Sequence, residues 1–100
     1  MLPKGRTENK MTKAIITVIG HDTVGLLSKV STECARFNAN ILDVTQSVLQ
    51  DIFTMVMVVD ISDISSDFAE LANSLEKLGD EINMKIHVMH EDIFNSMHRI

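Results

Sequence analysis

The chain has 100 residues, 45% of them hydrophobic and 23% charged, and its formal net charge at pH 7 is −5. This length suits one domain with a hydrophobic core, and the acidic balance disfavours binding to the phosphates of nucleic acids. The lone Cys34 excludes an internal disulfide and any CxxC metal or redox site. Since no run is long enough to cross a bilayer and no hydrophobic signal-peptide region is present, we expect a cytoplasmic protein with no membrane or nucleic-acid partner.

The N-terminal stretch differs in character from the rest of the chain. Residues 1–12 are mostly polar, contain the only proline and lack hydrophobic periodicity, which predicts a disordered leader. We expect one folded domain over residues 13–91. The hydrophobic and mostly β-branched run 14–19 predicts its first strand, placed in the middle of a sheet and buried on both faces.

The strand leads into the segment Gly20-His21-Asp22-Thr23-Val24-Gly25, which predicts a tight turn into a helix over residues 26–37. Asp22 or Thr23 can cap that helix. Its predicted apolar face consists of Leu27, Val30, Cys34 and Phe37. The first N–H groups of such a helix have no partner inside it, and the position favours a carboxylate or phosphate. The same sequence pattern would also fit a capped strand-to-helix connection that binds no ligand, as found in any α/β protein.

Two strands joined by a short turn follow. The alternation of Leu42, Val44 and Val48 with Asp43, Thr45 and Ser47 predicts a strand over residues 41–49 with one buried and one polar face. The turn at Gln50-Asp51 indicates a hairpin with a strand over residues 52–61. That strand is apolar on both faces, so one face is expected under helices and the other under something else.

The remaining pattern completes a familiar element order. A second helix is predicted from Phe68 to Leu78, with Gly79 as its C-terminal stop, and a last strand is predicted over residues 83–90. The order strand, helix, strand, strand, helix, strand predicts an α+β, ferredoxin-like βαββαβ sandwich. Its antiparallel four-stranded sheet would have the first and third strands in the centre and both helices on one face.

A short C-terminal helix is predicted over residues 92–100. Its apolar stripe consists of Ile93, Phe94, Met97 and Ile100. A helix of this length is marginal alone, so it needs the uncovered sheet face or a second subunit. We therefore expect a homodimer or a larger homo-oligomer.

The loop from Gly20 to Leu26, together with the apolar strand before it, resembles the glycine-containing loop of ACT domains. The match extends to Asn40-Ile41, which stands 15 residues after Gly25, where ACT domains enter their second strand, and to the element order. The chain looks most like the small stand-alone bacterial ACT proteins. A weaker similarity is to the ACT repeats of the glycine-cleavage repressor group.

The resemblance implies a regulatory module that binds an amino acid or a related metabolite. In ACT domains the effector typically lies between the loop before the first helix and the start of the second strand, often across a subunit interface. The matching positions are Gly20, His21, Asp22, Thr23, Val24, Gly25, Leu26, Asn40, Ile41 and Asp43. Val24 stands where many members have proline, and Asp22 stands where amino-acid-binding members often have asparagine. The second departure weakens a simple transfer of amino-acid specificity.

The resemblance implies that Gly25 lets the effector approach the main chain closely. The main-chain N–H groups of residues 24–26 could then take the effector's carboxylate. Asn40 could bond either end of the effector because an amide both donates and accepts. Asp43 could reach an ammonium group, or it could simply be solvated.

Other function classes find less support. His87 and His90 are three apart in a predicted strand and so point to opposite faces, and no compact metal-ligand set emerges. We expect no metal, no other cofactor and no catalytic residue, because the chain has no nucleophile with a convincing base and no Walker-type phosphate loop. Two hypotheses follow: a non-catalytic ligand sensor that acts on a regulated protein partner, and a structural dimerisation or protein-interaction module without a ligand.

Overall fold

The fold is seen in a computed structural model that describes residues 11–21 and 25–97. Its elements follow in the order β1 (Lys13–Gly20), α1 (Leu26–Arg36), β2 (Asn40–Leu49), β3 (Ile52–Asp60), α2 (Phe68–Glu81), β4 (Lys85–His90) and α3 (Glu91–Met97). Most of the predicted leader and the last residues of the predicted terminal helix lie outside the described residues.

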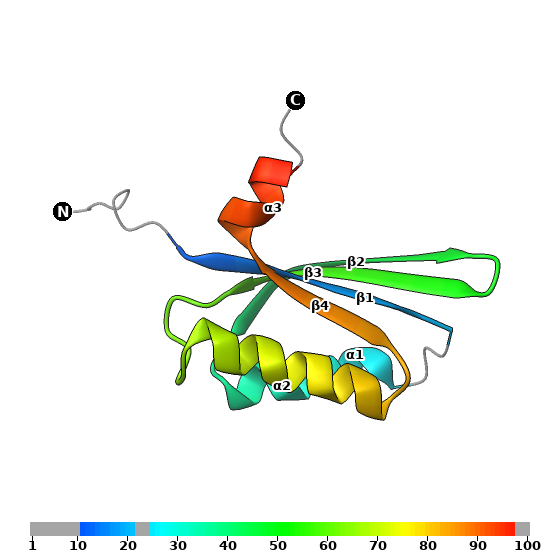
Figure 1. The fold of residues 1–100 in the computed structure, drawn as a ribbon, viewed down its shortest axis with the longest axis horizontal. Coiled ribbons are helices and arrows are strands. Elements are labelled where there is room, and N and C mark those ends of the chain that lie inside the picture. The colour runs from blue at the N-terminus through cyan, green and yellow to red at the C-terminus, as the bar shows by residue number, and fades with distance from the viewer. Residues whose placement is uncertain (1–10, 22–24, 98–100) are drawn as a thin grey trace.

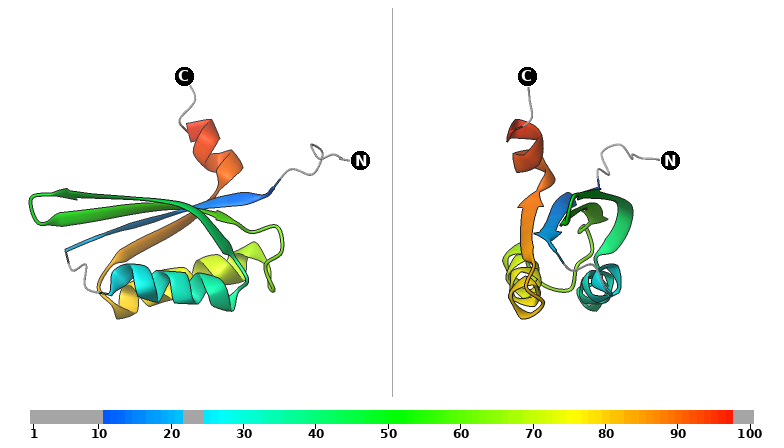
Figure 2. Two further views of the ribbon diagram at one scale, coloured as in Figure 1. Left: turned by 180° about the vertical axis from the view of Figure 1, so that it is seen from behind. Right: turned by 90° about the vertical axis from the view of Figure 1, so that its right-hand side faces the viewer.

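The strands form one antiparallel four-stranded sheet in the order β2-β3-β1-β4. Helices α1 and α2 cover one face of this sheet, and α3 rises from the other side (Figures 1 and 2). The predicted ferredoxin-like architecture is therefore confirmed, with β1 and β3 in the centre. These two strands are central because both are apolar on both faces, whereas the edge strands carry more polar side chains.

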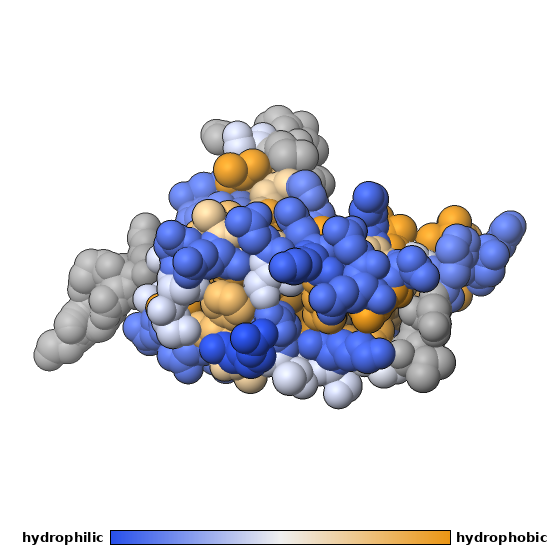
Figure 3. Space-filling model, turned by 60° about the horizontal axis from the view of Figure 1, so that its bottom comes forward, coloured by the Kyte–Doolittle hydropathy of each residue, from blue (hydrophilic) through white to orange (hydrophobic). Residues whose placement is uncertain are grey.

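The core lies between the sheet and the two helices. Alternate residues of β1 and β3 point toward the helices and are fully buried, as the period of a strand requires. They include Ala14, Ile16, Val18, Met55, Met57 and Val59. Leu71 and Leu75 of α2 fill the other side. The outer surface of the helix layer is mostly hydrophilic, with hydrophobic surface toward the end where the β2–β3 hairpin extends (Figure 3).

One prediction about α1 is wrong. Leu27 was expected on the apolar face, but its side chain is 41% exposed, and Leu26 is buried instead. Leu26 shares a face with Val30 and Cys34 because residues four apart lie above one another on a helix. Phe37 forms the C-cap and is partly buried against the core.

The predicted burial pattern of β2 is confirmed at Val44 but is wrong at Leu42 and Val48. A register shift between Ile41 and Asp43 marks a bulge, so Ile41 and Val44 pack against the core. Leu42 is 41% exposed and Val48 is 65% exposed. The extra residue of a bulge shifts the alternation. The far half of the β2–β3 hairpin also extends past the ends of the helices, so no helix covers it (Figure 1).

The second face of β3 is not covered by α1 or α2, as predicted. Val56 and Val58 are half-buried there, and Ile52 is 43% exposed. Helix α3 begins directly after β4 and packs against β1 and β4. Ile93, which was predicted on the apolar stripe of this helix, is exposed.

Helix α2 begins as predicted but does not end at Gly79. Asp67 is its N-cap, and the Oδ1 atom of Asp67 accepts a hydrogen bond of 2.9 Å from the N–H of Glu70. The helix continues through Gly79 to Glu81, and the left-handed residue after it is Asn83, with φ of 60°. The last strand therefore starts at Lys85, later than predicted. Gly79 is buried in the helix and lets β4 approach closely.

We predict that Gly79→Ala destabilises the fold by about 1–3 kcal/mol, because the new side chain overpacks the contact. A Cβ at this position would lie 2.7 Å from the carbonyl O of Met84 and 2.9 Å from Cγ1 of Ile86. Urea unfolding measures the change, and Asn73→Ala on the exposed side of α2 is the control. Alanine is the better helix former by about 1 kcal/mol, so a stabilised Gly79→Ala protein would contradict the packing assignment.

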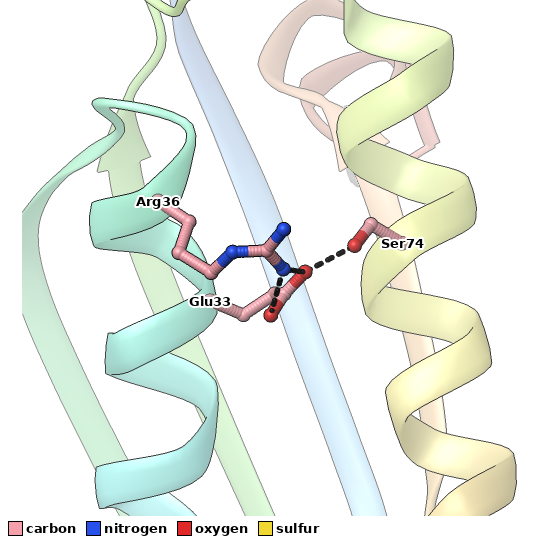
Figure 4. Close-up of polar contacts among 3 residues, drawn as sticks. All are labelled: Glu33, Arg36 and Ser74. Atoms are coloured by element: carbon pink, nitrogen blue, oxygen red, sulfur yellow. Dashed lines mark hydrogen bonds and ion pairs between the residues drawn. The ribbon is translucent and has the colours of Figure 1, made fainter.

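A polar link joins α1 to α2 on the outer side of the helix layer (Figure 4). Nη1 of Arg36 donates to both carboxylate oxygens of Glu33, at 2.9 and 2.8 Å, and the Ser74 hydroxyl donates to Oε2 of Glu33. Burial alone would raise the pKa of Glu33, but the hydrogen bonds from Ser74 and Arg36 and the charge of Arg36 outweigh it, so the pKa lies below the ordinary value of 4.5.

A carboxylate with a lowered pKa stabilises the fold above its unfolded-state pKa, and this contribution is lost as the pH falls through the folded-state pKa. We therefore expect Glu33→Gln to be less stable than the wild type at pH 7 by about 1 kcal/mol. The difference should shrink below about pH 4. Denaturant unfolding at several pH values tests this, with exposed Glu76→Gln as the control. A difference that is the same at pH 7 and pH 3 would contradict the assignment.

Candidate functional site

The predicted loop residues lie where β1 ends and α1 begins. His21 follows β1, and its Nδ1 atom lies 3.1 Å from the carbonyl O of Asp51 in the β2–β3 turn. The same nitrogen is 3.7 Å from Oδ2 of Asp51, and the His21 side chain is 72% exposed. The loop end of the domain is therefore also the hairpin-turn end. Asp22, Thr23 and Val24 lie outside the described residues.

Gly25 occupies the N-cap of α1 in the left-handed conformation, with φ of 68°. The expectation that Asp22 or Thr23 occupies this cap is wrong. Gly25 has no side chain to accept from the first turn, and among the described residues no acceptor faces the N–H groups of Leu26, Leu27 and Ser28. Open N–H groups at a helix start carry partial positive charge and suit an anionic group.

Asn40, Ile41 and Asp43 lie at the opposite end of α1. Asn40 is exposed and pairs with Asp60 of β3 in the sheet. Ile41 packs against the core, and Oδ1 of Asp43 accepts from the N–H of Val44 at 2.9 Å. Because α1 has 11 residues and a helix rises about 1.5 Å per residue, its length separates these residues from Gly25. One chain alone does not bring the two groups together.

Asn40 borders a hollow of about 430 Å³ at this end of the domain. Asn38, Asp60 and Asp63 also line it. Nδ2 of Asn38 donates to the carbonyl O of Asp63 at 2.9 Å, and Oδ1 of Asp60 accepts from the N–H of Ser62. The hollow is therefore acidic, and it lies beside the C-terminus of α1, where the helix dipole also favours a cation.

A second hollow, of about 450 Å³, lies at the loop end, between β1 and the end of α2. We call it the α2-end hollow, and its lining includes Gly20, His21, Gly79, Asp80, Met84 and Lys85. Sequence reasoning assigned Gly20 and His21 to a ligand but missed Asp80 and Lys85. The acidic end of α2, which lacks a basic residue in its last turn, is the one sequence signal that pointed there.

The histidines and the cysteine do not form a further site in the described part of the chain. His87 and His90 lie on opposite faces of β4, as predicted: His87 pairs with Thr17, and the ring of His90 packs edge-on against Phe68 with centroids 5.9 Å apart. Burial, and to a smaller extent the charge of Glu33, raises the pKa of Cys34 to about 11. Its thiol is therefore protonated at neutral pH.

The structure adds one observation on membranes. No helix among the described residues is both long and apolar enough to span a bilayer.

Comparison with known proteins gives a consistent result. The profile of the ACT domain matches residues 12–89. A UPF0237 protein of Methanococcus maripaludis is 53% identical over 90 residues, covering 90% of this chain and 100% of the relative. The solved ACT domain protein from Streptococcus pneumoniae superimposes with a TM-score of 0.75 at 42% identity, covering 85% of this chain and 96% of that one.

A more distant structure shares the fold. The regulatory subunit of aspartate kinase from Thermus thermophilus, in its ligand-free form, gives a TM-score of 0.60 at 22% identity and covers 79% of this chain and 51% of that one. ACT domains are regulatory modules that bind small ligands and commonly oligomerise. The profile match, the relatives and the βαββαβ sheet all agree. This chain therefore belongs to the ACT domain family.

Proposed function

We propose that the protein is a non-catalytic regulatory module that binds an amino acid or a related small metabolite. The observation that carries this proposal is the start of α1, where Gly25 leaves the first N–H groups without a described acceptor. In a family of ligand-binding regulatory modules, such a position suits the effector's carboxylate. Asp22, Thr23 and Val24 belong to this proposed site as neighbours of Gly25 in the chain.

Two copies would complete the site, because Gly25 and Asn40 lie at opposite ends of α1. Strand β2 is an edge strand, and a two-fold axis beside it would set the β2 strands and the α1 helices of two copies antiparallel. The start of β2 in one copy would then face the hairpin-turn end of the other. His21 and Asp51 mark that end as the loop end. We therefore propose a homodimer with two equivalent sites.

The partner's half of such a site would suit the effector's ammonium group. Asn40, Asp60 and Asp63 line one hollow, and carboxylates together with an amide oxygen accept hydrogen bonds from a cation. Asp43, three residues after Asn40, is exposed. Its Oδ1 atom already accepts a hydrogen bond from the N–H of Val44. We expect it to contribute charge rather than a direct contact.

A second candidate function rests on exposed apolar side chains. Leu42, Val48 and Leu49 are exposed on the edge strand β2, and apolar surface at a sheet edge favours contact with another protein. A structural dimerisation or protein-interaction module without a ligand would use the same edge. In the sensor, the same contact would pass the ligand's state to a regulated protein in the cytoplasm.

A thermal-shift screen of the full chain against the twenty protein amino acids and common metabolites separates the two functions. A ligand at about 100 times its dissociation constant adds about 2.7 kcal/mol. Each kcal/mol raises the midpoint of a domain of this size by about 4–8 °C. We expect at least one clear shift for a sensor. A stable dimer by light scattering without any shift would favour the interaction module.

We predict that Gly25→Val abolishes the shift produced by any ligand found in this screen. The left-handed backbone at Gly25, with φ of 68°, disfavours a β-branched residue by about 1–2 kcal/mol, and relief of this strain would turn the first N–H groups of α1 away from their present direction. Thr32→Val, at an exposed position of the same helix, is the control and should keep the shift. Unchanged ligand affinity in folded Gly25→Val would contradict the proposed site.

A further inference from the structure

The α2-end hollow offers a place for a small ligand within a single chain. Its volume of about 450 Å³ falls in the range of about 300–1,000 Å³ that is usual for ligand sites. Its lining residues come from the end of β1, the end of α2 and the start of β4, three points that lie at one end of the molecule (Figure 1). It shares Gly20 and His21 with the positions matched to the ACT effector site, but Asp80 and Lys85 lie outside those positions and the hollow needs no residue of a second chain.

The floor of this hollow is apolar and closely packed. Gly20 and Gly79 have no side chains to fill it, and Met84 lies beside Gly20: a Cβ on Gly20 would be 2.1 Å from Sδ of Met84. Met84 is buried, whereas Ile19 at the rim is exposed. A short aliphatic or thioether side chain of a ligand could lie on this floor without displacing polar groups.

One wall of the hollow is negative. Asp80 lines the hollow from the last turn of α2. That turn contains no basic residue, although the negative end of a helix dipole favours cations. Glu81, the next residue, lines a different hollow, between α1 and α2. Gly79 accepts hydrogen bonds from the N–H groups of Ile82 and Met84, while no described N–H reaches the carbonyls of Asp80 and Glu81. A cationic group placed here would relieve an unfavourable arrangement of charge.

The opposite charge lines the same hollow. Lys85 begins β4, directly across the turn from the end of α2. Neither Asp80 nor Lys85 forms an ion pair or a side-chain hydrogen bond with another described residue. His21 also lines the hollow, but its ring contacts Asp51. Within the part of the chain that the structure describes, the hollow thus presents a carboxylate and an ammonium group without a partner for either.

We propose that the α2-end hollow binds a free α-amino acid as a zwitterion, with the ammonium at Asp80 and the carbonyls of α2 and the carboxylate at Lys85. The proposal rests on the proposed function and deepens it, because it names a ligand class and a second place for it in each chain. A dianion would be repelled by Asp80 and a diamine by Lys85, whereas a zwitterion meets opposite charge on both sides.

Two charge-removing variants test the proposal, each with a matched control. Asp80→Asn and Lys85→Gln remove the charges that line the hollow. Glu81→Gln removes the same charge from the adjacent exposed residue of α2, and Lys77→Gln removes a lysine from a different surface between the helices. All four residues are exposed. Without ligand, the midpoint of thermal unfolding of each variant should therefore stay close to that of the wild type.

The measurement is calorimetric titration of the full-length variants with the amino acid that gives the largest thermal shift, and with its α-carboxamide and its des-amino acid. We expect Asp80→Asn and Lys85→Gln each to weaken binding at one site per chain about tenfold to a hundredfold and to leave the two-copy site unchanged. The two controls should bind like the wild type, and both analogues should bind weakly at the α2-end hollow.

The outcomes separate this inference from the proposed function. If Asn40→Ala weakens binding while Asp80→Asn and Lys85→Gln do not, the hollow is not the site and the proposed function stands. If Glu81→Gln weakens binding as much as Asp80→Asn, only general charge is involved and the inference is overturned. If no amino acid binds the wild type, the proposed function and the inference both fail.

Discussion

The structure depends on the pairing of β1 with β3 and the burial of their shared face. Alternate side chains of these two strands are fully buried under α1 and α2, and this contact holds the helices to the sheet. The remaining strands add to the outside of this pair. Because β1 ends where the helix layer also ends, its last residues lie at the end of the domain where α1 begins and α2 ends (Figure 2).

This topology gathers backbone groups of opposite polarity. Helix α1 begins at the same end at which α2 finishes, so the backbone donors of one helix and the backbone acceptors of the other lie at one end of the domain. The proposed two-copy site would use the donors of α1, and the proposed site in the α2-end hollow would use the acceptors of α2. The opposite end of α1 has its own acidic hollow, which a second copy would present to the loop.

The sequence predicted most of the architecture because hydrophobic periodicity reports burial directly. The alternation of Met55 and Met57 with Val56 and Val58, for example, gave both faces of β3 correctly. It could not predict the bulge at Leu42, since one extra residue leaves no mark in the composition. Gly79 predicted a helix end because glycine often follows the last turn of a helix. In the structure it lies inside α2, where the missing side chain lets β4 pack closely. The pattern predicted that a strand follows α2 closely, but it did not predict that Asp80 and Lys85 line one hollow with the end of β1, because that depends on the tertiary packing.

The direct succession of β4 and α3 has a mechanical consequence. His90 is the last residue of the strand and Glu91 the first of the helix, so no loop lies between them to absorb a change of direction. The other end of the same strand is Lys85. A tilt of β4 that begins at Lys85 would therefore change the orientation of α3 at the far end of the domain. The orientation of α3 is therefore tied to that of β4 along the whole length of the strand.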